Sequence, residues 1–294
     1  MTLIAADDLH RLLENPRGGE PRVRAVDLRW YLGRPGEGRA AYERGHVPGA
    51  IHLDLDADLS GPDGPARGLG RHPLPDPAEF AGRLAALGIG TDDLVVGYDD
   101  AGGWVAARLW WMLDTLGHDR TAVLDGGLQA WVSAGFGLST VEPDWEPADL
   151  RLADRWTGTI DRDELRARLG GPLLLDARAP ARYRGETEPV DPVAGHIPTA
   201  LSAPWDGNVD GDLRLLPPDV LREHFEALGA TADRAAAGEV VPYCGSGTSA
   251  CHHALAMRVA GLPDPTIYVG SYSDWSRSGL PIATGPEPGG ARRR

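Results

Sequence analysis

The sequence predicts an α/β fold made of two small domains in tandem, each built on a parallel sheet. Short apolar strands alternate along the chain with helical patterns, which is typical of parallel α/β units. The second half of the chain also repeats the landmarks of the first half in the same order. A length of 294 residues suits one large or two ordinary domains. We therefore expect a duplicated domain.

Four landmarks recur in both halves at a nearly constant offset. The offsets lie between 144 and 150 residues, which is far longer than the repeat of a solenoid. The pairs are an aspartate that ends a strand, the histidine of a Gly-His-x-Pro turn, a strand-terminal tyrosine and a helical tryptophan. They are Asp27 with Asp176, His46 with His196, Tyr98 with Tyr243, and Trp131 with Trp275.

These landmarks place the domain boundaries. We expect a first domain over residues 1–139 and a second domain over residues 157–285, followed by a flexible tail over 286–294. The intervening linker, 140–156, is rich in proline and acidic residues and has no apolar period. The expected strands are 24–28, 94–98, 172–176 and 239–243, and the clearest expected helices are 78–87 and 103–116.

Composition limits the function classes. A formal net charge of -14 disfavours general binding of nucleic acid or of an anionic membrane, because the phosphates would be repelled. An anionic substrate would need arginines placed locally. Two cysteines seven residues apart form no disulfide framework, and we find no secretory signal and no apolar run of the roughly 18 residues that a membrane span needs. We therefore expect a cytoplasmic protein.

One of the two cysteines, Cys244, occupies a position suited to chemistry. In the stretch VVPYCGSGTSACHHALAM it follows directly after the strand that ends at Tyr243. Ligands of parallel α/β sheets bind beyond the carboxyl ends of the strands. The cysteine thiolate is the reactive form, and nearby positive potential favours it.

The loop after Cys244 would supply that potential. Its two glycines, Gly245 and Gly247, let the backbone curl so that successive N–H groups point inward and bind an anion. A helix beginning near Ser249 adds the partial positive charge of its N-terminus, and Ser246 and Thr248 add hydroxyl donors. We therefore interpret Cys244 as a nucleophile.

The first copy of the repeat separates fold from function. In register with Cys244 it has Asp99, which has no sulfur, so the fold does not require the cysteine. The turn histidines His46 and His196, by contrast, are present in both copies. We expect these histidines, and the strand-terminal Asp27 and Asp176 as well, to stabilise the fold.

Two other interpretations of the cysteine loop are weaker. Consecutive helical residues such as Cys251, His252 and His253 point about 100° apart, so they cannot converge on one metal ion. Cys251 aligns with Ala106, which favours a buried filler, although a resolving thiol remains open. A cysteine phosphatase would need an arginine six residues after the cysteine, where this chain has Ala250.

Taken together, these residues resemble the two-domain rhodanese superfamily of sulfurtransferases over residues 1–285. The loop Cys244-Gly-Ser-Gly-Thr-Ser-Ala250 is similar to Cys-Gly-Ser-Gly-Val-Thr-Ala of the 3-mercaptopyruvate branch and departs from it at Thr248 and Ser249. The thiosulfate-specific branch has basic residues directly after the cysteine. The further matches are DLRWYL at 27–32, the two Gly-His-x-Pro turns, DAR at 176–178 and RYRG at 182–185.

This resemblance implies two rhodanese-like domains, each with a central parallel sheet flanked by helices, of which only the second carries the catalytic cysteine. It also implies a ping-pong reaction in which Cys244 takes sulfur from 3-mercaptopyruvate as a persulfide. A thiol, cyanide or a thioredoxin-like protein then accepts the outer sulfur. The resemblance calls for no cofactor or metal.

It also implies site residues. Arg182 matches the arginine that binds the donor's carboxylate, and Ser246 matches a serine that polarises the donor carbonyl or helps proton transfer. His72 and Asp56 match first-domain residues proposed to form a relay with that serine. Trp30 lies within a matched motif and is a further candidate for substrate binding. The remaining loop residues, Gly245, Gly247, Thr248 and Ser249, would hold the substrate sulfur.

One departure bears on the donor. The branch commonly has a second binding arginine nine residues after the first, where this chain has Asp191. A carboxylate cannot bind the donor's carboxylate, so Arg178 or Arg184 would have to compensate, or thiosulfate would serve as donor. The alternatives are therefore a thiosulfate:cyanide sulfurtransferase, a persulfide carrier that serves another enzyme, and a cysteine phosphatase-like enzyme.

Overall fold

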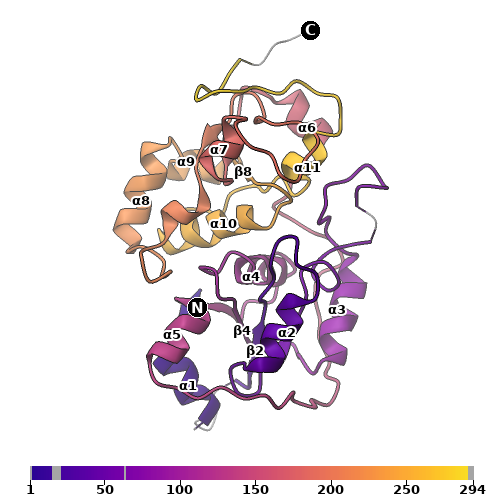
Figure 1. Ribbon diagram of the computed structural model, residues 1–294, viewed down its shortest axis with the longest axis vertical. Helices are drawn as coiled ribbons and strands as arrows, with labels where there is room; N and C mark the ends of the chain where they lie inside the picture. Colours follow the sequence, from indigo (N-terminus) through magenta and orange to yellow (C-terminus); the bar gives the residue numbers. More distant parts are fainter. Residues whose placement is uncertain (1, 15–20, 63, 291–294) are drawn as a thin grey trace. The chain divides into compact units, whose positions relative to one another are not determined.

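The computed structural model describes residues 2–14, 21–62 and 64–290, which form two compact units (Figure 1). The first unit comprises Met1–Gly61, Pro75–Thr157 and Val209–Leu215, and the second comprises Pro62–Leu74, Gly158–Asn208 and Leu216–Arg294. Each unit thus takes one short segment from the other half of the chain. The last four residues of the expected tail, including its arginines, lie outside the described residues.

The first unit contains a five-stranded parallel sheet, as the alternation of strands and helices predicts. Its strand order is β1-β5-β4-β2-β3, and every pairing is parallel. Val and Leu side chains are frequent in the central strands because both faces of such a sheet are covered. The strands are β1 Leu3–Ile4, β2 Val23–Asp27, β3 Ile51–His52, β4 Leu94–Tyr98 and β5 Thr121–Leu124.

The second unit repeats the central part of this sheet. Its three parallel strands have the order β7-β6-β8, which corresponds to β3-β2-β4 of the first unit. In place of the two outer strands, the described part of the chain forms only a parallel bridge between Thr159 and Ile267. The strands are β6 Leu173–Asp176, β7 Leu201–Ser202 and β8 Val240–Tyr243.

Helices connect the strands of both units (Figure 1). The predicted helix 78–87 begins one residue earlier, with Pro77 in its first turn and Asp76 capping the N–H groups of Ala78 and Glu79. None of the helices in the described residues is long and apolar enough to cross a bilayer. They are α1 Ala6–Glu14, α2 Glu37–Arg44, α3 Pro77–Ala86, α4 Ala106–Thr115 and α5 Gly127–Ser133, then α6 Arg162–Ala167, α7 Pro180–Tyr183, the 3₁₀ helix η1 Trp205–Asn208, α8 Pro218–Ala227, α9 Ala232–Ala236, α10 Ser249–Val259 and α11 Ser271–Trp275.

The paired aspartates form buried ion pairs in both units. Asp27 binds Arg29 at 2.6 Å, and Asp176 binds Arg178 at 2.6 Å, with both carboxylates fully buried. Each arginine also donates to the carbonyl of the glycine that precedes the turn histidine. A charge pair of this kind holds the end of the strand to the turn. The structural role expected for both aspartates is confirmed.

The turn histidines make matching contacts in the two units. The ring of His46 stacks on Tyr42 with its Nδ1 2.8 Å from the Tyr42 carbonyl, and His196 stacks on Tyr183 with the same distance and contact. Both histidines are fully buried. Their rings fill the space between turn and helix, which confirms that they stabilise the fold.

The segment expected to be a linker contains no helix or strand and is grouped with the first unit. The guanidinium of Arg24 lies 4.1 Å from the ring centre of Trp145 in a cation–π contact. A Cβ on Gly88 would lie 2.4 Å from the Cβ of Trp145, so glycine makes this close packing possible.

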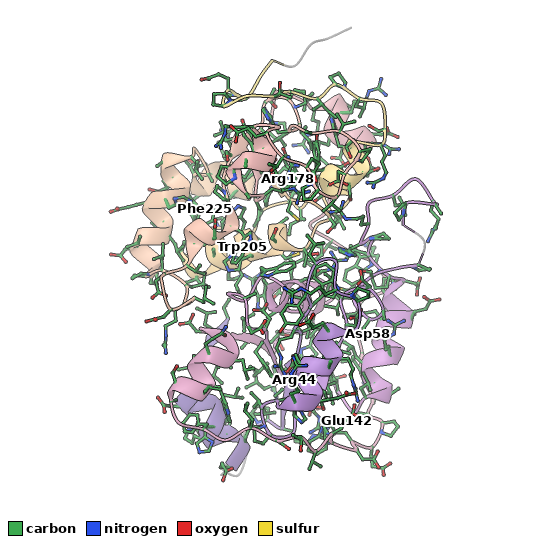
Figure 2. The ribbon with its side chains drawn as sticks, viewed as in Figure 1. Arg44, Asp58, Glu142, Arg178, Trp205 and Phe225 are labelled. Carbon is green, nitrogen blue, oxygen red and sulfur yellow. The ribbon has the colours of Figure 1, made fainter. Side chains whose placement is uncertain are left out.

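In the second unit, a buried histidine links η1 to α10, the helix that follows the cysteine loop. His253 lies between Asn208 Nδ2, 2.9 Å from its Nδ1, and the Ala203 carbonyl, 2.7 Å from its Nε2. Phe225 of α8, labelled in Figure 2, contacts the ring edge-on. Burial lowers the pKa of His253 from 6.5 to about 4. The native state therefore holds this imidazole neutral.

This histidine predicts an acid-sensitive contribution to stability. Because the folded pKa is lowered, the unfolded chain binds the proton first, so stability falls as the pH drops from about 6.5 to about 4, by up to about 3 kcal/mol. We expect the stability advantage of the native chain over His253→Gln, measured by urea unfolding, to be larger at about pH 7 than at about pH 4.5. Equal differences at the two pH values would contradict this.

Candidate active site

Cys244 lies where the sequence places it, immediately after β8, and its side chain is almost fully buried. The Gly247 N–H points at the sulfur, with nitrogen and Sγ 3.1 Å apart. The Cys244 N–H in turn donates to Ser271 Oγ at 3.1 Å. The sulfur thus faces a backbone donor at the point where the strand turns into α10.

Glycine at position 247 makes this turn possible. Its φ of 83° lies in the left-handed region that favours glycine, and a Cβ there would lie 2.4 Å from the Val269 carbonyl oxygen. The residues of α11 fix the strand end from the other side. Tyr272 donates its N–H to the Cys244 carbonyl, and Ser273 donates to the Gly245 carbonyl, both at 2.9 Å.

The corresponding loop of the first unit encloses a carboxylate. Asp99 accepts four backbone hydrogen bonds, from Ala101 at 2.9 Å, Gly103 at 2.8 Å, Val105 at 2.9 Å and Ala106 at 3.1 Å. Burial raises the pKa of Asp99, and these four N–H groups oppose the rise. The loop of the first unit is therefore a ring of N–H donors around its own Asp99 side chain.

Ser246 and His72 lie together in the second unit. Ser246 Oγ and His72 Nδ1 are 2.7 Å apart, and both side chains are buried. His72 comes from the 62–74 segment that the first half of the chain contributes to this unit. The structure thus brings together two of the residues that the resemblance selected. The other loop hydroxyl, Thr248 Oγ1, is buried without a hydrogen-bond partner among the described residues, and Ser249 begins α10.

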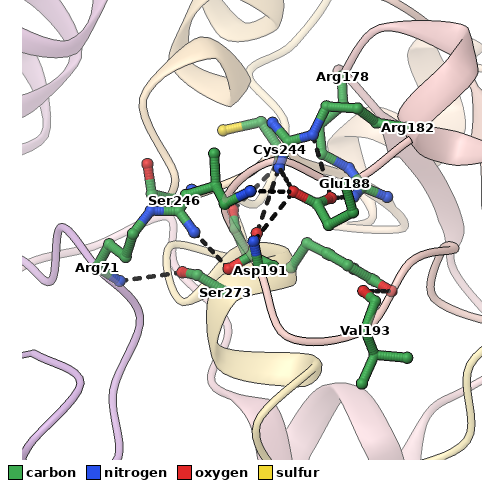
Figure 3. A network of polar contacts seen from close by, with 12 residues as sticks. Arg71, Arg178, Arg182, Glu188, Asp191, Val193, Cys244, Ser246 and Ser273 are labelled. Carbon is green, nitrogen blue, oxygen red and sulfur yellow. Dashed lines mark hydrogen bonds and ion pairs between the residues drawn. The ribbon is translucent and has the colours of Figure 1, made fainter. Parts of the chain in front are cut away.

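Arg182 of α7 lies beside the cysteine loop within a network of charged side chains (Figure 3). Its Nη2 is 2.6 Å from a Glu188 oxygen and 3.3 Å from an Asp191 oxygen. Burial raises the pKa of Glu188, but the hydrogen bonds from Arg182 and from two backbone N–H groups outweigh it, so the pKa lies below its ordinary value. Glu188 is therefore a carboxylate at neutral pH.

A second guanidinium lies over the same loop. Arg71 forms an ion pair with Asp191, and its Nη2 lies 2.9 Å from the point where a Gly245 Cβ would stand, while Arg182 Nη1 lies 3.4 Å from that point. The buried Arg71 Nε has no hydrogen-bond partner among the described residues. Sequence reasoning missed Arg71. The available signal was its place directly before His72.

The two arginines expected to compensate for Asp191 are occupied elsewhere. Arg178 is almost fully buried, binds Asp176 and Glu188, and stacks on Tyr272 with its guanidinium carbon 3.8 Å from the ring centre. Arg184 is paired with Glu186 at the surface. Binding of the donor's carboxylate by either residue stays a prediction, and this geometry does not favour it.

Asp56 and Trp30 belong to the first unit. Trp30 donates its Nε1–H to Asp56 Oδ2 at 2.7 Å, and its ring makes an edge contact with Trp104. The two residues are thus paired with each other, and their expected functional roles stay predictions.

Cys251 is buried in α10, where its Sγ lies 3.3 Å from the Gly247 carbonyl as a hydrogen-bond donor. Its helical neighbours His252 and His253 both contact Asn208. Across the described residues, no group of three or more His, Cys, Asp or Glu side chains is arranged to hold a metal ion. The side chain of Cys251 thus connects α10 to the cysteine loop through a hydrogen bond.

Comparison with known proteins identifies the class. The model of the rhodanese-like domain matches the chain twice, over residues 5–134 and 161–278. These two matches span most of the chain and correspond to the two halves of the internal repeat. The chain therefore belongs to the rhodanese family, with two rhodanese-like domains.

Named relatives cover nearly the whole chain. A probable 3-mercaptopyruvate sulfurtransferase of Pseudomonas aeruginosa is 46% identical over 276 residues, covering 92% of this chain and 95% of the relative. A putative thiosulfate sulfurtransferase, SseB, of Mycobacterium tuberculosis is 39% identical over 277 residues, with 93% of each chain covered. The crystal structure of the 3-mercaptopyruvate sulfurtransferase SseA of Escherichia coli superposes with a TM-score of 0.78 at 28% identity, covering 93% of this chain and 100% of that one.

The role of Gly247 is testable with two matched substitutions. Gly247→Ala combines a positive φ with a clash at Val269, so we expect alkylation of Cys244 by iodoacetamide to slow at least about tenfold. Gly279→Ala is the control, since Gly279 has a similar φ of 74° but its Cβ would meet no atom within 4 Å. Equal alkylation rates in the two variants would show that the clash at Val269 does not matter.

Proposed function

We propose that this protein is a sulfurtransferase that takes sulfur from 3-mercaptopyruvate and passes it to a thiol or cyanide through a persulfide on Cys244. The observation that carries the proposal is the position of Cys244, whose Sγ faces the Gly247 N–H and whose neighbour Gly245 lies against the guanidinium groups of Arg71 and Arg182. A loop of this kind stabilises an anionic sulfur, and the arginines attract an anionic donor. The names of the relatives support this activity.

In the first half-reaction, the Cys244 thiolate attacks the sulfur of the donor. A sulfur–sulfur bond forms and the carbon–sulfur bond of the donor breaks, with its electron pair passing to the enolate of pyruvate. A proton taken up at the enolate carbon gives pyruvate, and the proton of the donor thiol is released. The persulfide carries the negative charge on its outer sulfur, which the backbone N–H groups of the loop bind.

The polar groups around Cys244 divide this work between them. Arg71 and Arg182 would bind the carboxylate of 3-mercaptopyruvate, each donating hydrogen bonds from its guanidinium group. Ser246, 2.7 Å from His72, would donate to the carbonyl oxygen that becomes the enolate oxygen, with the imidazole as its proton partner. This arrangement stabilises charge where it develops during carbon–sulfur cleavage.

In the second half-reaction, an acceptor nucleophile attacks the outer sulfur. The persulfide bond breaks, its electron pair returns to Cys244, and the thiolate is restored. Cyanide and small thiols suit the almost closed surroundings of the sulfur, and a thioredoxin-like protein is a further proposed acceptor. The acidic chain and its two cysteines, neither of which forms a disulfide, fit a reducing, cytoplasmic setting.

Thiosulfate is the alternative donor. Its sulfane sulfur would be attacked in the same way, with sulfite leaving. The presence of a thiosulfate sulfurtransferase name among the relatives favours measuring both donors. A carrier that serves another enzyme would form the same persulfide but would not turn over with small acceptors.

The persulfide is the direct test of this function. After exposure to 3-mercaptopyruvate, we expect the mass of the peptide containing Cys244 to rise by about 32 Da, the mass of one sulfur atom. Cys244→Ser should abolish both this shift and turnover. Cys251→Ala is the control and should keep both, since Cys251 lies inside α10. Full sulfur transfer by Cys244→Ser would overturn the proposed function.

If the two guanidinium groups bind the carboxylate of the donor, removing either one should weaken the binding of charged donors only. We expect Arg71→Gln and Arg182→Gln each to raise KM for 3-mercaptopyruvate about tenfold or more. With mercaptoacetone, which lacks the carboxylate, KM should change much less. Arg222→Gln, on the exposed face of α8, is the control. An equal loss with both donors would argue against carboxylate binding.

A further inference from the structure

We propose that Asp191 sets the charge preference of the donor site, so that the site favours a monoanionic over a dianionic sulfur donor. This inference rests on the proposed function. Asp191 stands where the resemblance predicts a second arginine, so it changes the charge of the site by two units relative to that expectation. Its contacts show that the carboxylate is an organised part of the site.

Asp191 gathers three arginines on one buried carboxylate. Its side chain is 0% exposed, and its Oδ1 pairs with Arg71 and with Arg277 at 3.0 Å, while its Oδ2 lies 3.3 Å from Arg182. Figure 3 shows Arg71 and Arg182 on either side of it, near Ser246 and Cys244. A fully buried carboxylate is stable only when it is paired in this way.

The arrangement leaves the donor site with a small positive charge. Three arginines, Arg71, Arg182 and Arg277, share the two carboxylates of Asp191 and Glu188, which leaves one net positive charge. Arg178 is excluded from this count because Asp176 neutralises it. One net charge balances one carboxylate.

The two candidate donors differ in exactly this property. 3-Mercaptopyruvate with its thiol protonated carries one negative charge, and thiosulfate carries two. The Cys244 thiolate repels both donors. The one net positive charge of the arginines and carboxylates offsets the charge of the first donor and leaves the second with an excess negative charge close to Asp191 and Glu188. Repulsion across a few ångströms in partly buried surroundings is sufficient to discriminate between them.

Asp191→Asn tests this inference because the amide keeps the shape of the side chain and removes the charge. We expect the ratio of kcat/KM for thiosulfate to kcat/KM for 3-mercaptopyruvate to rise about tenfold. Glu186→Gln is the matched control, a carboxylate-to-amide change in the same segment whose partner, Arg184, lies at the surface. Its ratio should stay at the native value. Because each ratio is measured on one preparation, partial unfolding cancels.

A second readout is independent of turnover. The rate of Cys244 alkylation by anionic iodoacetate, divided by the rate with neutral iodoacetamide, reports the local potential, and we expect this quotient to rise several-fold in Asp191→Asn alone. If neither ratio changes, the inference is wrong even where the native protein forms the persulfide. If the native protein forms no persulfide with 3-mercaptopyruvate, the proposed function fails, and the inference fails with it.

Discussion

The hydrogen bonds that backbone N–H groups donate to the side chain following β4, and to the side chain following β8, define the loop on which each unit is built. In the first unit this side chain is Asp99, whose carboxyl group accepts from four N–H groups. In the second unit the loop begins with Cys244, and the Gly247 N–H faces its sulfur. The carboxyl group of Asp99 fills its loop from within. Under the proposed function, the loop of Cys244 also receives the sulfur of the donor.

The residues around each loop hold its backbone in place. The Asp–Arg pair at the end of the neighbouring strand and the stacked His–Tyr pair at the turn occur in both units with nearly equal distances. They are buried and pack against the strand ends, so they fix the positions from which the loop curls. The loop of the second unit is accompanied by Arg71, His72 and Arg182, the side chains that the proposed function uses.

Much of the fold could be predicted because it rests on local patterns. The strand ending at Tyr243 and the helix beginning at Ser249 were both expected from the alternation of apolar residues, glycines and small polar residues. The helix expected over 103–116 begins only at Ala106, since Gly103 adopts a positive φ to bring its N–H to Asp99. The replacement of the two outer strands by a bridge at Ile267 in the second unit could not be predicted, because a single bridge leaves no periodic signal in the sequence.

From the pattern of residues alone, the candidate site was predictable only where sequence neighbours form it, and the distant His72 and Arg182 were selected by the family resemblance. The loop from Cys244 to Ser249 is contiguous, whereas the partnership of Arg71 with Asp191 spans 120 residues and has no pattern along the chain. Arg178 was a reasonable candidate because arginine binds anions, but its three internal partners became visible only in the structure. Ion pairs between residues that are far apart in the sequence, and the charge balance that they produce, cannot be predicted from local sequence patterns.

The short segment Pro62–Leu74 has a consequence for how this protein can evolve. It is encoded in the copy that lacks the cysteine, yet it packs into the unit that contains it and supplies Arg71 and His72. A gene fragment encoding only the second copy would keep Cys244 and lose both of these residues. Under the proposed function, the second copy therefore depends on the first for two side chains of its site, and the copies cannot be separated without losing them.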